Sequence, residues 1–91
     1  MKLQFHVKIF GKVQGVWFRA NTKNKADEFY LTGWVKNTND GGVEAIFEGE
    51  ENNLKNIINW CLKGPPSANV EKIEIHKKEF TNKFHNFSII P

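Results

Sequence analysis

The spacing of apolar residues changes repeatedly along this chain, and that change limits the folds it can adopt. In the first ten residues, Leu3, Phe5, Val7 and Ile9 alternate with polar residues, which is typical of a half-buried strand. The spacing then becomes helical, returns to alternation for two segments, and becomes helical again before a final alternating region. Because the chain has only 91 residues, we expect one domain, residues 1–91, that mixes helices and strands.

The first helical segment follows a glycine-containing break in the pattern. Residues then fall at helical intervals, at Thr22, Ala26, Phe29, Tyr30 and Gly33. We expect Gly33 to end this helix, because glycine readily takes the left-handed conformation found after many helices.

Two strands joined by a tight turn are predicted next. Residues 34–38 and 43–48 have strand-like composition, and the sequence between them contains Asp40-Gly41. An Asp-Gly pair between two such segments is a strong signal for a β-hairpin. We therefore expect these two strands to pair with each other in antiparallel fashion.

A second helix and two final strands complete the pattern. Acidic residues crowd the start of the helix, and its apolar positions form one stripe, made by Leu54, Ile57, Ile58 and Cys61. A glycine and two prolines at 64–66 should end it. Residues 70–80 and 84–90 then indicate strands.

The resulting order is βαββαβ plus a short final strand. Two helices with one apolar stripe each, and strands with one apolar face, predict a ferredoxin-like two-layer α+β sandwich. We expect both helices to pack on one face of an antiparallel sheet. This arrangement serves many unrelated activities, so it does not identify one by itself.

Composition limits the classes of function. A single cysteine, Cys61, excludes an internal disulfide and a zinc site built from cysteines. No signal-peptide pattern or membrane-spanning apolar run is visible, so we expect a cytoplasmic protein without a membrane partner. The net charge of +3 is spread along the chain, which suits a solvated basic surface.

The loop between the first strand and the first helix has the features of an anion site. Gly11 and Gly15 permit a tight backbone in which several N–H groups converge, and a helix N-terminus adds partial positive charge. Arg19 adds a planar group of donors matched to phosphate oxygens. The known glycine-rich nucleotide motifs do not match. On these features alone, a plain strand-to-helix turn with a surface arginine remains equally acceptable.

Two longer stretches resemble the signatures of the acylphosphatase family. The stretch "GKVQGVWFR", residues 11–19, is similar to the first signature, and "GWVKNTNDGGVEAIFEG", residues 33–49, is similar to the second. Both match without a gap, and the likeness continues through nearly the whole chain. The family has the ferredoxin-like fold that the apolar pattern predicts.

The resemblance implies a specific chemistry. Acylphosphatases hydrolyse the carboxyl–phosphate mixed anhydride to a carboxylate and inorganic phosphate, without a metal or other cofactor. The family's catalytic residues correspond to Arg19 and Asn37, with Asn37 positioning a water for in-line attack. The loop at 12–18 corresponds to the phosphate cradle, and the implied phosphate-binding residues are Gln14, Gly15, Val16, Trp17, Phe18 and Arg19.

Some alternatives remain open at this point. A non-catalytic module that binds an anion or RNA could use the same fold, although the aromatic RNA-binding motif is absent. A family member with another role is also compatible with the sequence. We expect a monomer that acts on a small-molecule acyl phosphate and binds no nucleic acid. Whether Gln14 or Thr38 contributes to catalysis is left open, and the scattered histidines form no catalytic motif.

Overall fold

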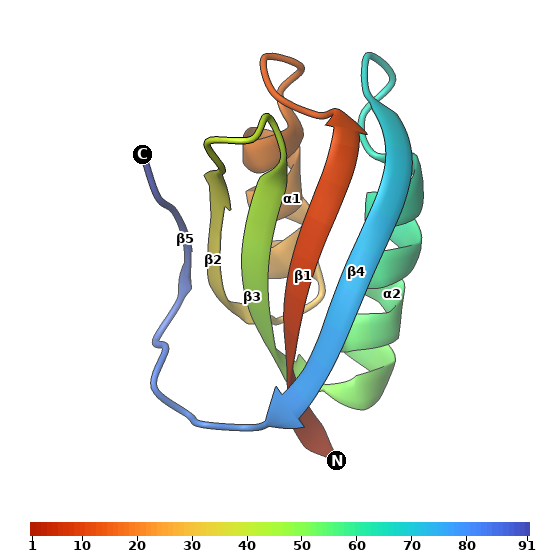
Figure 1. Ribbon diagram of the computed structural model, residues 1–91. Coiled ribbons are helices and arrows are strands. Elements are labelled where there is room, and N and C mark those ends of the chain that lie inside the picture. The colour runs from red at the N-terminus through yellow and green to blue at the C-terminus, as the bar shows by residue number, and fades with distance from the viewer.

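The computed structural model describes residues 1–91 and has the predicted order of elements (Figure 1). The elements are β1 (Lys2–Lys12), α1 (Phe18–Glu28), β2 (Thr32–Asn37), β3 (Val43–Glu50), α2 (Glu51–Lys63), β4 (Asn69–Glu79) and β5 (Phe87–Ile89). Both helices lie on one face of the sheet, so the predicted two-layer sandwich is confirmed. Neither helix is long and apolar enough to span a bilayer.

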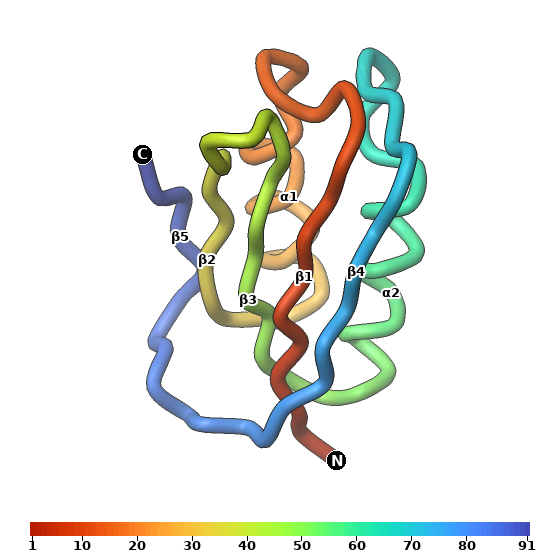
Figure 2. The backbone as a smooth tube through the Cα atoms, in the orientation of Figure 1, coloured from red at the N-terminus to blue at the C-terminus, as the bar shows by residue number.

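The sheet has the strand order β4-β1-β3-β2-β5, and it is mixed, not purely antiparallel as predicted. The strands β1 to β4 pair in antiparallel fashion, whereas β5 runs parallel to β2. The cause is visible in the backbone trace, where the chain leaves β4, crosses one end of the sheet and enters β5 from that end (Figure 2). Because β2 also starts at that end, β5 must run in the same direction as β2.

The hydrophobic core fills the space between the helices and the sheet. Alternate residues of β1 and β3 point into it, and so does the apolar stripe of α2. The fully buried members from these elements include Val7, Ile9, Val43, Ala45, Phe47, Leu54, Ile57 and Cys61. The predicted stripe is thus confirmed, with Ile58 partly buried at its edge. Burial raises the pKa of the Cys61 thiol, as expected for a cysteine that serves as a small core residue.

The end of α1 differs from the prediction. The helix stops at Glu28, and Tyr30, not Gly33, takes the left-handed conformation, with φ 57°. The N–H of Tyr30 donates to the carbonyl of Asp27 and that of Leu31 to Ala26, which is the hydrogen-bond pattern of a Schellman motif. Tyr30 is 86% exposed, so its place in the predicted apolar stripe is wrong.

Gly33 has a different task, inside β2. Its φ is 129°, and a Cβ on Gly33 would come within 1.9 Å of the carbonyl oxygen of Ile46. Glycine is needed at this position because the two backbones of β2 and β3 approach too closely for any side chain. The glycine was correctly singled out in the sequence, but its role is in the sheet.

Candidate active site

The loop between β1 and α1 is fixed by side chains that point inward. Val13, Val16 and Phe18 are buried, and Phe18 packs against Trp60 with ring centroids 5.4 Å apart. Between them, Gly15 and Trp17 take left-handed conformations, with φ of 72° and 66°. The buried side chains of Val13, Val16 and Phe18 anchor the loop, and the left-handed residues between them turn its backbone.

The backbone N–H groups of this loop are free. None from Val13 to Ala20 donates a hydrogen bond to another group of the protein. Trp17 is the N-cap of α1 but makes no side-chain capping bond, and the first turn contains no acidic residue. A helix start with unpaired donors and no internal carboxylate is suited to bind an external anion.

Arg19, the chain's single arginine, is also without a partner. It makes no ion pair and no side-chain hydrogen bond, although six lysines form ion pairs with carboxylates. The planar guanidinium therefore keeps all its donors available for an external group. Because guanidinium donors match phosphate and carboxylate oxygens in pairs, an oxyanion is the best-matched ligand.

Asn37 is the last residue of β2 and pairs with Val43 of β3. Its Oδ1 is buried, yet no protein group donates a hydrogen bond to it. It is the one buried side-chain polar atom of the chain in this condition. A buried acceptor without a donor typically costs about 1–3 kcal/mol of stability. Such a cost in a folded chain is a sign that the side chain serves something other than stability.

Arg19 and Asn37 line the same cleft, which has a volume of about 330 Å³. This is within the size range of small-molecule sites. The lining residues come from the loop, α1, β2 and β5, and they are Val13, Gly15, Trp17, Phe18, Arg19, Ala20, Asn37 and Ile89. No carboxylate and no histidine is among them, so Arg19 is the only charged group of the cleft.

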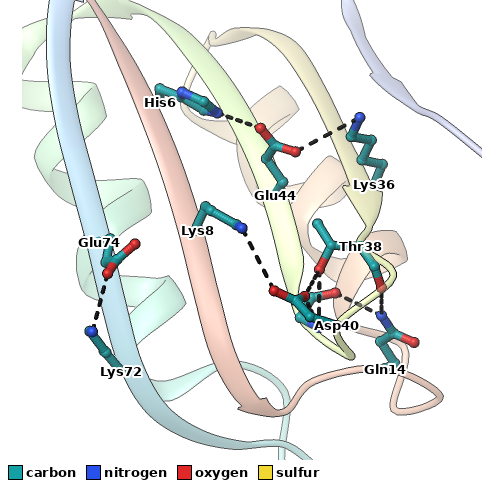
Figure 3. A network of polar contacts seen from close by, with 10 residues as sticks. His6, Lys8, Gln14, Lys36, Thr38, Asp40, Glu44, Lys72 and Glu74 are labelled. Carbon is teal, nitrogen blue, oxygen red and sulfur yellow. Dashed lines mark hydrogen bonds and ion pairs between the residues drawn. The ribbon is translucent and has the colours of Figure 1, made fainter.

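Gln14 connects the loop to the β2–β3 hairpin (Figure 3). Its Nε2 donates to the carbonyl oxygens of Thr38 and Gly42, each at 2.8 Å. Thr38 is occupied within the hairpin, since its hydroxyl contacts the carboxylate of Asp40 and accepts from the N–H of Gly42. The hydrogen bond from the Thr38 hydroxyl and a further one from the N–H of Gly42 to the Asp40 carboxylate lower the pKa of the Asp40 carboxyl. The side chain of Gln14 thus holds the loop next to the strand that carries Asn37.

The structure brings most of the predicted site residues into one place. Gly15, Trp17, Phe18, Arg19 and Asn37 line the cleft, whereas Gln14, Val16 and Thr38 do not. Val16 points into the core and Gln14 toward the hairpin, as their burial and hydrogen bonds require.

Two lining residues, Ala20 and Ile89, had no predicted role. For Ala20 the helical spacing after Arg19 could have indicated its place. No sequence signal would have brought Ile89, from β5, beside the loop.

Comparison with known proteins identifies the family to which this site belongs. The acylphosphatase family model matches residues 5–89. The chain belongs to the acylphosphatase family. An acylphosphatase of Chloroflexus aurantiacus is 48% identical over 85 residues, which are 93% of this chain and 92% of that relative. An acylphosphatase of Geotalea uraniireducens is 46% identical over 89 residues, 98% of each chain.

Solved acylphosphatase structures have the same fold. The crystal structure of the acylphosphatase from Bacillus subtilis superposes with a TM-score of 0.94 and 38% identity, covering 98% of this chain and 99% of that chain. An acylphosphatase from Coxiella burnetii gives a TM-score of 0.92 at 36% identity, covering 98% and 93% of the two chains. The predicted family and fold are therefore confirmed, and they support hydrolysis of acyl phosphates as the general activity.

Proposed function

We propose that the chain hydrolyses acyl phosphates by direct attack of water on phosphorus, with Arg19 and the loop amides holding the phosphoryl group. One observation carries the proposal: the residues that carry an unpartnered guanidinium, unpaired backbone N–H groups and an unpartnered carboxamide oxygen line a single cleft. Each of these groups is unsatisfied within the protein, and each can bind a part of the reacting assembly.

The phosphoryl group is the part that the loop can bind. Its anionic oxygens accept hydrogen bonds, and the N–H groups of Gly15 to Ala20 and the guanidinium of Arg19 are free donors, so the two sides are complementary in charge. Charge on these oxygens is redistributed in the transition state of phosphoryl transfer, where positioning and electrostatic stabilisation provide most of the catalysis. Donors held by a rigid loop stabilise that charge without reorganising at the moment of reaction.

Asn37 is the proposed residue for orienting water. Its carboxamide offers one acceptor and two donors at the edge of the same cleft, so it can hold a water in line with the bond that breaks. A carboxamide does not titrate near neutral pH and cannot be a general base. The proton of the water therefore passes to a phosphate oxygen or to solvent. The leaving carboxylate is a weak base and needs no acid to assist it.

The cleft is built by one chain, so we propose that the monomer is the active unit. The chain has no cluster of three or more His, Cys, Asp or Glu side chains that could hold a metal ion. Metal independence is part of the proposal and is tested together with the activity.

The alternative of RNA binding on the open face of the sheet is not favoured. Three lysines of that face are paired with carboxylates, as Figure 3 shows for Lys8 with Asp40, Lys36 with Glu44 and Lys72 with Glu74. Paired lysines release little counterion on binding nucleic acid, which weakens the electrostatic drive that RNA binding requires.

The test is release of benzoate and phosphate from benzoyl phosphate, with EDTA present and no added metal, by the wild type and by Asn37→Ala. We expect rapid turnover by the wild type and a kcat lower by about 10²–10³ in the variant, as for loss of one preorganised catalytic group. Inhibition by inorganic phosphate should persist in the variant, because Arg19 and the loop remain.

The variant also separates a catalytic role from a structural one. Since Asn37→Ala removes a buried acceptor that has no donor, its thermal stability should equal or exceed that of the wild type. Retained turnover in Asn37→Ala would contradict the assigned role of Asn37. No turnover by a folded wild type, with or without Mg²⁺, would contradict the proposed function itself.

A further inference from the structure

The cleft has two chemically different parts. The polar part consists of the loop N–H groups, Arg19 and Asn37, and the rest of the lining is apolar. Val13 and Phe18 are buried and form its floor, whereas Trp17 and Ile89 are 77% and 40% exposed. Both exposed side chains line the same cleft that contains Arg19. The other exposed large apolar side chains, Met1, Tyr30, Leu62 and Ile75, do not line this cleft, so Trp17 and Ile89 form the one exposed apolar pair at its opening.

Trp17 is unfavourable for the folded chain in two ways. Its backbone is left-handed, a conformation that costs a bulky residue free energy, and its indole is mostly in contact with water. Ile89 reaches the cleft only because β5 pairs with β2, where Ile89 lies opposite Val35. The two residues lie far apart in the sequence, yet both side chains line one opening.

The charged groups near this opening are already engaged. Lys23, one helical turn after Arg19, donates to the carboxylate of Asp27 at 3.0 Å and to the carbonyl of Phe87 at 3.1 Å. Arg19 is the only cation among the residues that line the cleft, and in the proposed reaction it binds the phosphoryl group. The acyl part of a substrate would contact the aliphatic side chain of Ile89 and the indole of Trp17.

We infer that Trp17 and Ile89 form an apolar wall that binds the acyl part of the substrate and selects aromatic and other apolar acyl phosphates over small or carboxylated ones. This inference rests on the proposed function and adds the substrate class to it. An aromatic acyl group would lie against the indole and the Ile89 side chain, which are both partly dehydrated by the contact. A second carboxylate in the acyl group would find no cation to pair with.

The experiment compares kcat/KM for benzoyl phosphate with that for acetyl phosphate in the wild type, Trp17→Ala and Ile89→Ala. The ratio between the two substrates is the measured quantity, because any damage to the phosphoryl site affects both substrates and cancels. We expect the ratio to fall by about 10-fold in Trp17→Ala, the scale of discrimination available to a hydrophobic pocket, and by less in Ile89→Ala. Trp17→Phe should restore most of the wild-type ratio, since it returns an aromatic face.

Trp34→Ala is the matched control. Trp34 lies on β2 with Lys36 over its ring, and it is not among the residues that line the cleft. Loss of this indole should leave the ratio unchanged. If the ratio of the two kcat/KM values fell as much in Trp34→Ala as in Trp17→Ala, the inference would be contradicted, because the effect would not be local to the cleft.

Binding of stable analogues distinguishes failure of this inference from failure of the proposed function. Calorimetric titration with phenylphosphonate and methylphosphonate measures the apolar wall without any hydrolysis. Tighter binding of phenylphosphonate, with the preference lost in Trp17→Ala, would support the wall even if the wild type hydrolysed neither substrate. Equal binding of the two phosphonates, or an unchanged substrate ratio in both cleft variants, would overturn it.

Discussion

The two ends of the sheet differ in whether a buried polar side chain has hydrogen-bond partners. At the far end from the cleft, the carboxylate of Glu48 is only 1% exposed and accepts four hydrogen bonds. They come from Gln4 Nε2, from the N–H and hydroxyl of Thr81, and from the N–H of Asn82. At the cleft end, Asn37 Oδ1 accepts none. The buried polar group at the far end has its partners within the chain, and the one at the cleft end has none.

The helix N-termini repeat this difference. The first turn of α2, at the far end, contains its own carboxylate, Glu51, whose backbone N–H also donates to the carbonyl of Met1. The first turn of α1, at the cleft end, has neither an acidic residue nor a capping bond. Because both helices have the same dipole, the sequence of the first turn decides which one is open to an external anion. The N-terminus of α2 is therefore stabilised by groups of the protein, whereas that of α1 is open to an external anion.

The largest expected effect is the loss of activity in Arg19→Ala. Removal of the only cation of the cleft should lower kcat/KM for benzoyl phosphate by about 10²–10³ or more, and should weaken inhibition by phosphate. The free energy of unfolding should change little, because Arg19 has no partner in the protein. Lys25→Ala, which removes a half-buried cation at the other end of α1, is the control. Phosphate inhibition as strong as in the wild type would rule out the phosphoryl contact.

At the far end of the sheet, we expect a substitution to lower stability and to leave activity nearly unchanged. Glu48→Ala leaves the N–H groups of Thr81 and Asn82 and the amide of Gln4 without their acceptor, so we expect a loss of about 3 kcal/mol in the free energy of unfolding. The measurement is urea denaturation followed by circular dichroism. Any fall in kcat/KM at a temperature where the variant is folded should be small. A variant that unfolds like the wild type would show that this anchor does not stabilise the fold.

The pH dependence of stability checks the same anchor. Burial alone would raise the pKa of the Glu48 carboxyl, but the hydrogen bonds from Thr81, Gln4 and Asn82 lower it below its ordinary value of 4.5. A group with a lowered pKa in the folded state contributes stability above that ordinary value and loses it as the pH falls through the folded pKa. As the pH falls from 5 to below the folded pKa of Glu48, the free energy of unfolding should therefore decrease less in Glu48→Gln than in the wild type. The reason is that the variant has about one fewer carboxylate to protonate.

The smallest expected effect concerns the left-handed residue at the end of α1. Tyr30→Gly relieves the strain of a left-handed tyrosine and sacrifices little burial, so we expect a gain of about 0.5–1 kcal/mol. The melting temperature should rise while kcat/KM stays constant. Trp17, the left-handed residue of the cleft, gives the contrast, since its replacement should change substrate preference. Lower stability in Tyr30→Gly would indicate that the tyrosine side chain contributes contacts after all.

The parts of the fold that could be predicted from the sequence are those that depend on residues close together in the chain. The stripe of α2 and the Asp-Gly turn each depend on residues close together in the chain, and both are present as predicted. The parallel pairing of β5 and the anchoring of Glu48 join segments far apart in sequence, and alternation gives no information about either. Glu48 has the same place in the pattern as any solvent-facing glutamate, and its partners Gln4, Thr81 and Asn82 all lie far from it in sequence.

The candidate site divides in the same manner. The glycines and Arg19 of the loop indicate an anion site from local chemistry, and Asn37 was proposed through the resemblance of residues 33–49 to a family signature. That both line one cleft depends on the pairing of β2 with β3 and on the bonds of Gln14 to the hairpin. The left-handed backbone of Trp17 could not be expected, because tryptophan rarely takes it.

The route of β5 has a practical consequence for attaching anything to this protein. The two termini lie at opposite ends of the sheet (Figure 1), with the Met1 ammonium next to Glu50 and the last strand beside the cleft. A tag, fusion partner or surface linker joined before Met1 would leave from the end that carries no ligand. The same attachment after Pro91 would start close to Ile89 and would screen the opening of the cleft.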